Sequence, residues 1–163
     1  MRKVEVINLK DVARQVKLFF SHEFCLYGND IGGTAYFDPR SCSIIHYKIN
    51  RYFLISSWAH GQWGVQHFAC GRRESSGNSE RINGTSNGEL SGVASAWGSP
   101  HSTIAIWLEL SAKGTTEAYY WMAAGTTYPE VANLNLEVHN ITPEKLIKRS
   151  SKYWQTWIHK DSL

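Results

Sequence analysis

The chain has 163 residues, which is enough for one domain with its own hydrophobic core. Its net charge is +3, with Lys and Arg residues spread along the sequence, and this excludes a basic stripe for nucleic acid. No apolar run approaches the ~18 residues of a membrane helix and no signal peptide precedes the first predicted strand, so we expect a cytoplasmic protein.

The first third of the sequence predicts short antiparallel strands separated by turns. Residues 2–9 alternate between apolar and polar side chains, and we expect residues 14–20 to return as the second strand of a hairpin. Residues 15–57 as a whole predict a meander of three or four strands. Its last strand, at residues 52–56, has apolar side chains on both faces, which is typical of a strand covered on both sides.

A glycine-rich loop at residues 27–33 connects the first two strands of this meander. It is too long for a tight hairpin, and its glycines and Asn29-Asp30 pair tolerate positive φ and cap turns. We interpret it as a structured surface loop. It is either a wide connection between strands or a loop shaped to meet a partner surface or a sugar.

The middle of the chain predicts strands on either side of a long loop. Residues 62–70 predict a strand, whereas Ser, Gly and Asn dominate residues 74–98. A loop of that length in a compact domain is usually functional or mobile. Residues 103–110 are the clearest strand, and we expect residues 116–124 to return as its doubly covered hairpin partner.

The C-terminal part predicts two helices. Pro129 and Glu130 open the first, with Pro in the first turn and a carboxylate near the positive end of the helix dipole. Thr142 and Pro143 suit the N-cap and first position of the second. We expect the apolar side of this second helix to fold back on the β-structure or to dock on a second copy. That side carries Leu146, Tyr153, Trp154, Trp157 and Ile158.

The sequence offers few residues for catalysis or metal binding. It contains no Gly-x-Ser-x-Gly, phosphate loop or Cys-x-x-Cys, and its three cysteines lack the spacing of a zinc site or disulfide framework. We therefore predict no metal and no cofactor. His22 stands beside Glu23, and we interpret the two as a surface pair. Three further histidines are too far apart in sequence to form a ligand set by spacing, and we interpret them as core or edge residues. They are His46, His67 and His101.

A glycosidase needs two carboxylates that face the sugar, so the candidates are the carboxylates in predicted loops. Their spacing in the sequence gives no reason to pair any two of them, and we therefore predict no catalytic residue in this chain. These candidates are Asp30, Asp38, Glu74 and Glu89.

The tryptophans divide into two groups. Trp107 and Trp121 lie in strongly patterned strands and are predicted to be core residues. Trp58, Trp63 and Trp97 lie near loops and either fill an interface or stack on sugar rings, with packing favoured.

Several short stretches, taken in order, resemble one protein family. They lie at residues 27–32, 34–36, 38–39, 45–48, 51–55, 88–92, 98–99 and 153–157. Together they resemble the N-terminal β-domain of prokaryotic glucoamylase-like enzymes, glycoside hydrolase family fifteen, which includes glucodextranases and trehalases. The match runs from about Lys3 to Lys160, and the order of the pieces carries more weight than any one of them.

The resemblance implies a β-sandwich, called a supersandwich, followed by a helical linker. In the family a separate (α/α)6 barrel carries two catalytic glutamates that invert the anomeric centre. No position here matches those catalytic motifs, so no catalytic residue is carried over. Residues 85–87 and 97–101 depart from the family's long loop. From the resemblance we also expect the chain to lack the family's first strands.

We therefore predict a mainly β chain: an antiparallel β-sandwich at residues 1–126, lacking its first strands, and a helical linker pair at residues 127–163. The function that we expect is that of a non-catalytic domain or fragment of such an enzyme, without activity alone, in α-glucan or α-glucoside metabolism. A stand-alone carbohydrate-binding module or a small hydrolase with loop carboxylates remain alternatives.

The expected partners are the barrel or a second copy, and possibly α-glucan, but not nucleic acid or membrane. The residues that we expect to face a partner domain or sugar are Tyr27, Asn29, Asp30, Glu89 and Trp97.

Overall fold

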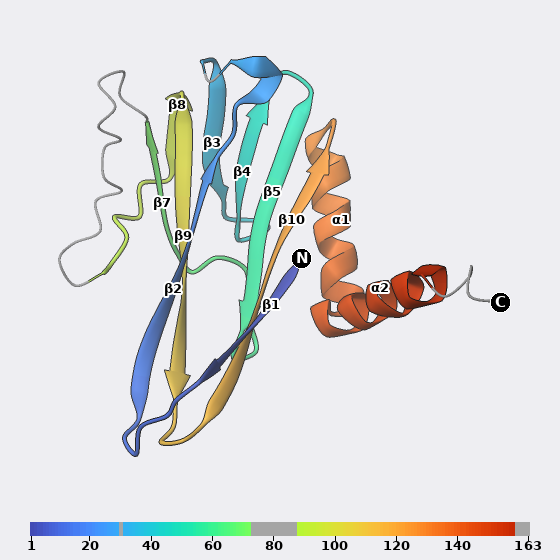
Figure 1. Cartoon of the computed structure of the whole chain (residues 1–163). Coiled ribbons are helices and arrows are strands. Elements are labelled where there is room, and N and C mark those ends of the chain that lie inside the picture. The colour runs from blue at the N-terminus through green and yellow to red at the C-terminus, as the bar shows by residue number, and fades with distance from the viewer. Residues whose placement is uncertain (30, 73–87, 159–163) are drawn as a thin grey trace.

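The computed structural model describes residues 1–29, 31–72 and 88–158, and it shows two antiparallel sheets packed face to face with two C-terminal helices (Figure 1). The predicted fold class is thereby confirmed. The strand order of the large sheet is β1-β10-β5-β4-β3-β8, with β6 paired to β5, and that of the small sheet is β2-β9-β7.

The strands of the large sheet are β1 (Arg2–Ile7), β3 (Gly33–Asp38), β4 (Ser43–Lys48), β5 (Arg51–Ala59), β6 (Gln62–Trp63), β8 (Ser95–Gly98) and β10 (Thr115–Gly125). Those of the small sheet are β2 (Arg14–Glu23), β7 (His67–Arg72) and β9 (Pro100–Leu110). A short 3-10 helix, Leu26–Gly28, follows β2.

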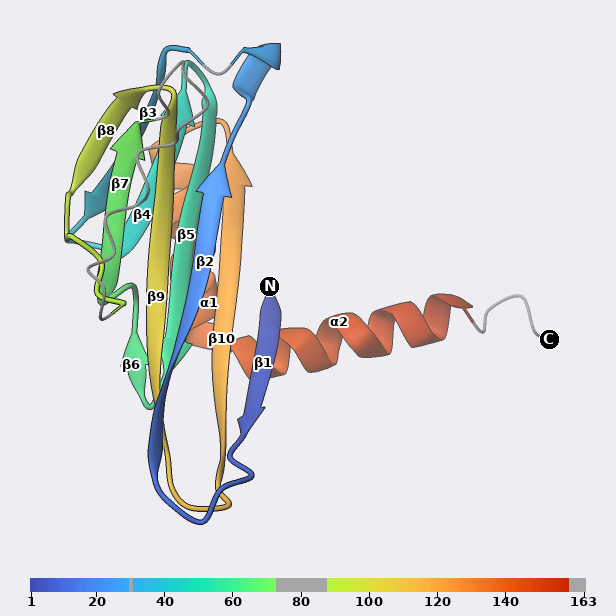
Figure 2. The same ribbon diagram turned by 60° about the vertical axis from the view of Figure 1, so that its left-hand side comes forward.

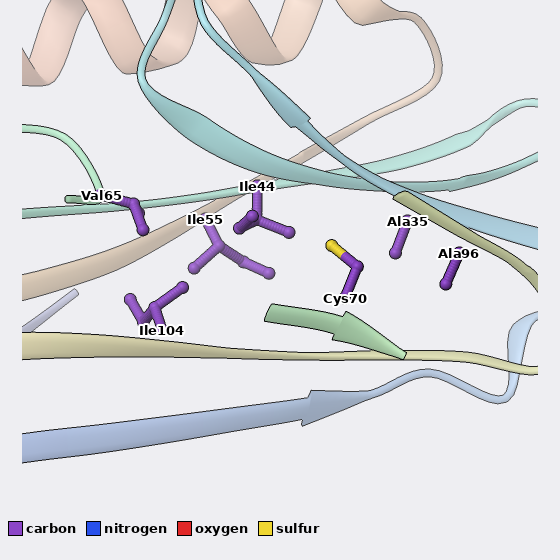
Figure 3. Close-up of a cluster of buried hydrophobic side chains, with 7 residues drawn as sticks. All are labelled: Ala35, Ile44, Ile55, Val65, Cys70, Ala96 and Ile104. Carbon is purple, nitrogen blue, oxygen red and sulfur yellow. The ribbon is translucent and has the colours of Figure 1, made fainter. Parts of the chain in front are cut away.

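The core lies between the two sheets, because alternate residues of each strand point inward. Ile44 of β4 and Ile55 of β5 face each other in register and meet Ile104 of β9 from the small sheet (Figure 3). The neighbouring residues Ile45 and Leu54 point the other way and are also fully buried. The prediction that residues 52–56 form a strand covered on both faces is therefore confirmed.

Both predicted hairpins are wrong, although the strands exist. β1 pairs with β10 in the large sheet while β2 pairs with β9 in the small sheet. The chain thus changes sheet twice at the same end, once after β1 and once after β9. The two connections bond to each other, with Asn8 N donating to Gly114 O and Lys113 N to Lys10 O. A turn signal in sequence shows where a strand ends, but not whether the next strand pairs with it or crosses over.

The predicted loop at residues 74–98 contains a strand. Its first part, residues 73–87, lies outside the described residues. Cys70 N of β7 donates to Val93 O and Phe37 N of β3 donates to Ala94 O, so this segment links the small sheet to the large one before β8 begins. The strand predicted at residues 62–70 is divided into β6 and β7.

Helix α1 (Tyr128–Ile141) covers the outer face of the large sheet at β5 and β10. The predicted start, with Pro129 and Glu130 in the first turn, is confirmed. The structure adds the cap: Thr127 Oγ1 accepts from Glu130 N, and Glu130 accepts from Thr126 N at 2.8 Å. These hydrogen bonds lower the pKa of Glu130 below its usual value. Trp121 Nε1 donates to Asn135 Oδ1 at 2.9 Å, which fixes the helix on β10.

Helix α2 (Pro143–Ile158) leaves the sandwich and projects into solvent (Figure 2). Thr142 between the helices has φ of +79° and turns the chain. The expectation that the apolar side of α2 folds back on the β-structure is wrong, because its four distal apolar side chains are more than half exposed. No helix in the described part of the chain is long and apolar enough to cross a membrane.

Candidate functional site

The loop before β3 is fastened to the turn between β4 and β5. Lys48 Nζ donates to Leu26 O at 3.1 Å and to Asn29 O at 3.0 Å, and Tyr27 Oη donates to Asn50 Oδ1. Asn29 Oδ1 accepts from Ile31 N at 2.7 Å, which forms a local turn. Tyr27 has φ of +60° and a half-exposed ring. Tyr27 and Asn29 are therefore held at one end of the sandwich.

Trp97 lies at the same end of the large sheet but on the edge strand. Gly98 pairs with Gly33, the residue that follows the loop, and Trp97 pairs with Thr34. The Trp97 side chain is 75% exposed. The cavity between the loop and β4 holds only about 10 Å³, which is room for one water molecule and not for a sugar ring.

The other two predicted contact residues do not join this group. Glu89 is exposed and acts electrostatically on His67 of β7, so it lies over the small sheet. Asp30 lies outside the described residues. The five residues predicted to face a partner or sugar are therefore not gathered into one pocket by the residues that the structure describes.

Of the loop carboxylates, Asp38 is buried at the end of β3 and is 2% exposed. Its Oδ2 accepts from Tyr128 Oη at 2.5 Å and from Ser41 Oγ at 2.9 Å, while Oδ1 accepts from Arg40 N at 3.2 Å. Burial raises the pKa of Asp38, but these hydrogen bonds outweigh it and keep the pKa below its usual value. Asp38 therefore attaches α1 to the sheet; Glu74 lies outside the described residues.

Three side chains that are distant in sequence form a buried polar chain with Tyr120. His22 Nε2 and Tyr120 Oη share a hydrogen bond of 2.6 Å, and Ser102 Oγ lies 2.8 Å from His46 Nε2 and 3.4 Å from His22 Nδ1. Ser102 is fully buried, so it offers no nucleophile to a substrate. Burial lowers the pKa of His22 to about 4 and that of His46 to about 3.

The interpretation as core residues is confirmed for His46 and His101, which are 1% and 3% exposed. The interpretation of His22 as part of a surface pair is wrong, because His22 is only 6% exposed and points into the space between the sheets. The contact between His22 and His46 through Ser102 could not be found from the sequence. The contact depends on β2 pairing with β9 in the small sheet and on β4 facing them from the large sheet.

Two of the loop tryptophans pack under α1. Trp63 stacks on His139 at 4.2 Å between ring centres and lies edge-on to Trp121 at 5.8 Å, while Trp58 contacts Trp63. Packing was the favoured prediction for Trp58, Trp63 and Trp97. It is confirmed for Trp58 and Trp63 and wrong for Trp97, whose side chain is 75% exposed. Trp121 is a core residue as predicted, whereas Trp107 is half-buried on the outer face of the small sheet.

Helix α2 carries a cluster of exposed apolar side chains on one side, which we name the α2 face. Its residues are Tyr153, Trp154, Trp157 and Ile158, which are 59%, 56%, 60% and 68% exposed. The rings of Tyr153 and Trp154 meet edge to face at 5.6 Å. Exposed apolar patches of this kind mark interaction sites.

The sequence matches no protein-family model, and no curated protein matches it either. Among solved structures, a bacterial glucoamylase complexed with acarbose aligns with it at a TM-score of 0.49 and 16% sequence identity. The alignment covers 86% of this chain and 20% of that chain, so this chain spans about a fifth of the length of that glucoamylase.

Proposed function

We propose that this chain is a non-catalytic β-sandwich domain of a glucoamylase-like glycoside hydrolase, which supports a separate (α/α)6 catalytic barrel in the cytoplasm. The observation that carries the proposal is the α2 face, which projects from the sandwich with its aromatic side chains in solvent. In the family that the sequence resembles, the matching helix leads toward the catalytic domain.

The α2 face has the chemistry of a helix that docks on a larger apolar surface. Burial of a large aromatic side chain contributes about 2 kcal/mol, so two tryptophans on one side of a helix supply a substantial part of an interface. The opposite side of α2 is polar, with Lys152 and Gln155 exposed. A helix with one apolar and one polar side fits a groove between helices of a partner, which a helical barrel provides.

The docking prediction uses the double variant Trp154→Ala/Trp157→Ala. The partner is an (α/α)6 barrel encoded beside this gene or, if none is encoded there, the separately produced barrel of a bacterial glucoamylase. We expect calorimetric titration to show binding that the double variant weakens about 100-fold, or about 3 kcal/mol. The melting temperature should stay within about 2 °C of the parent, because most of each indole is in solvent.

The matched control is Lys152→Ala/Gln155→Ala on the polar side of the same helix. It should bind the barrel like the parent. Absence of binding by the parent, or equal binding by the tryptophan variant, would contradict the proposal.

We also predict that the purified chain alone hydrolyses no α-glucoside. Inversion needs an acid and a base about 6.5–9.5 Å apart across the scissile bond. Asp38 is buried and hydrogen-bonded within the fold, and Glu89 lies over the small sheet. The measurement is glucose release from maltose, dextrin and trehalose. Release that follows the pure protein and disappears in Glu89→Gln would instead favour a small hydrolase.

A further inference from the structure

The edge of β10 is only half covered. β1 pairs with β10 from Thr115 to Tyr120, and the last pair is Arg2 with Tyr120. β10 continues to Gly125, and on its other side it stays paired with β5 throughout this stretch. In Figure 2 the N-terminus lies partway along β10. Within the described residues, the backbone from Trp121 to Gly125 therefore has no strand on the β1 side.

Inward-pointing side chains are exposed beside this edge. Met122 is in register with Ile55, a fully buried residue of the core between the sheets, so Met122 also points inward. Met122 is nevertheless 37% exposed, and Ala124, two residues further, is exposed too. In a closed sandwich such positions are buried. Their exposure shows that the space between the sheets is open here.

The open space is a groove of about 600 Å³ between β10 and β2. Its lining is mixed, with apolar side chains on one part and polar or charged ones on another. The apolar ones include Met122, Phe20 and Phe24, and the polar ones include Arg2, Ser21, His22, Glu23 and Tyr120. Phe20 stacks on Tyr120 at 4.5 Å between ring centres, and Phe24 stacks on Phe53 at 4.5 Å. Each of these rings therefore has one face covered by another ring, which leaves less aromatic surface for stacking on a sugar.

An unpaired strand edge beside an open groove with apolar residues at its inner end fits an extended polypeptide. The free N–H and C=O groups of the edge bind its main chain, and the groove takes alternate side chains. Five residues of edge are about 17 Å long, the length of an ordinary strand. The new strand would continue the line of β1 along β10.

We propose that this groove accepts an extended strand from a partner polypeptide, with apolar side chains at alternate positions that enter between the sheets. The strand pairs with Trp121–Gly125 of β10 and covers Met122 and Ala124. This surface is separate from the α2 face, so the proposal stands or falls independently of the proposed function.

The test measures amide hydrogen exchange along β10 with a short synthetic peptide in which valine and threonine alternate. At about 1 mM peptide, exchange in residues 121–125 should slow at least about ten-fold. Met122→Arg should abolish this protection, because a charged side chain would occupy the groove. The control Val12→Arg changes an apolar residue that is 63% exposed in the turn after β1, and it should leave protection intact.

A second variant removes the dependence on affinity, since tethering raises the effective concentration of the strand. The same alternating sequence is joined ahead of Met1 so that it runs on from β1. Residues 121–125 should become protected and the melting temperature should rise by about 5 °C, whereas a Gly/Ser extension of equal length should have neither effect.

Failure of the tethered strand to protect residues 121–125 would overturn the proposal, and so would failure of the free peptide at about 1 mM. Protection that grows with protein concentration alone would assign the groove to a second copy of this chain. Protection by maltoheptaose would assign it to a sugar. Either result also overturns the proposal.

Discussion

Lowering the pH from about 7 to about 5 should destabilise this protein by about 4 kcal/mol, because two buried histidines must remain neutral in the folded state. The pKa of His22 is lowered to about 4 and that of His46 to about 3, from an ordinary value of 6.5. Below pH 6.5 the unfolded chain therefore takes up protons that the folded chain does not. Stability is complete above that pH and falls as the pH approaches the folded values.

The cause of these shifts is burial, which a hydrogen bond with the Ser102 backbone partly offsets at His22 and which neighbouring histidines reinforce at His46. Desolvation is the largest influence on both histidines, and for His46 the charges that His22 and His101 would carry lower the pKa further. Tyr120 and Ser102 are the polar groups bonded to the pair. Both partners are neutral side chains, so neither stabilises a protonated ring as a carboxylate would.

Urea unfolding at about pH 7, 6 and 5 measures this effect. His46→Gln removes one of the two protonation sites and should reduce the loss between pH 7 and 5 to about 2 kcal/mol, whatever it does to stability at pH 7. His60→Gln, at an exposed histidine, is the matched control. If it flattens the profile as much as His46→Gln does, the buried pair is not the source.

The polar chain at these histidines shows why the sequence predicted elements better than sites. Ser102 lies 80 residues from His22 and 56 residues from His46 in sequence. Each residue separately fits the pattern of a strand. The core interpretation was correct for His46, whereas His22 was wrongly placed at the surface because Glu23 follows it. Their contact depends on which strands pair and which sheets face each other, and no local signal carries that information.

Local signals did predict the features that local physics determines. Apolar side chains on both faces identified the doubly covered strand β5. The signals at Pro129 and Pro143 placed the first turns of α1 and α2, which begin at Tyr128 and Pro143. The course of the chain after β1 and β9 was mispredicted, because a crossover and a hairpin begin with similar turns. The direction of α2 was also mispredicted, since it follows from the backbone at Thr142 and not from the apolar side of the helix.

Asp38→Ala should be the most destabilising change at the contact between α1 and the large sheet, with an expected loss of about 3 kcal/mol. The carboxylate accepts hydrogen bonds from Tyr128, the first residue of α1, and from Arg40 and Ser41 in the turn after β3. Its removal leaves the helix start and the turn without their common acceptor. The loss should be measured by urea unfolding at about pH 7.

Two smaller changes separate the contributions to this contact. Tyr128→Phe removes only the hydroxyl and should cost about 1 kcal/mol. Arg40→Ala removes a side chain that is 78% exposed, with Nε 3.4 Å from Asp38 Oδ1, and should cost less than about 1 kcal/mol.

The pKa of Asp38 lies below its usual value of 3.8, so the stability that its carboxylate contributes is complete above that pH and is lost only in stronger acid. Asp38→Ala should therefore lower stability equally at about pH 7 and pH 5, and a loss confined to either pH would contradict this role.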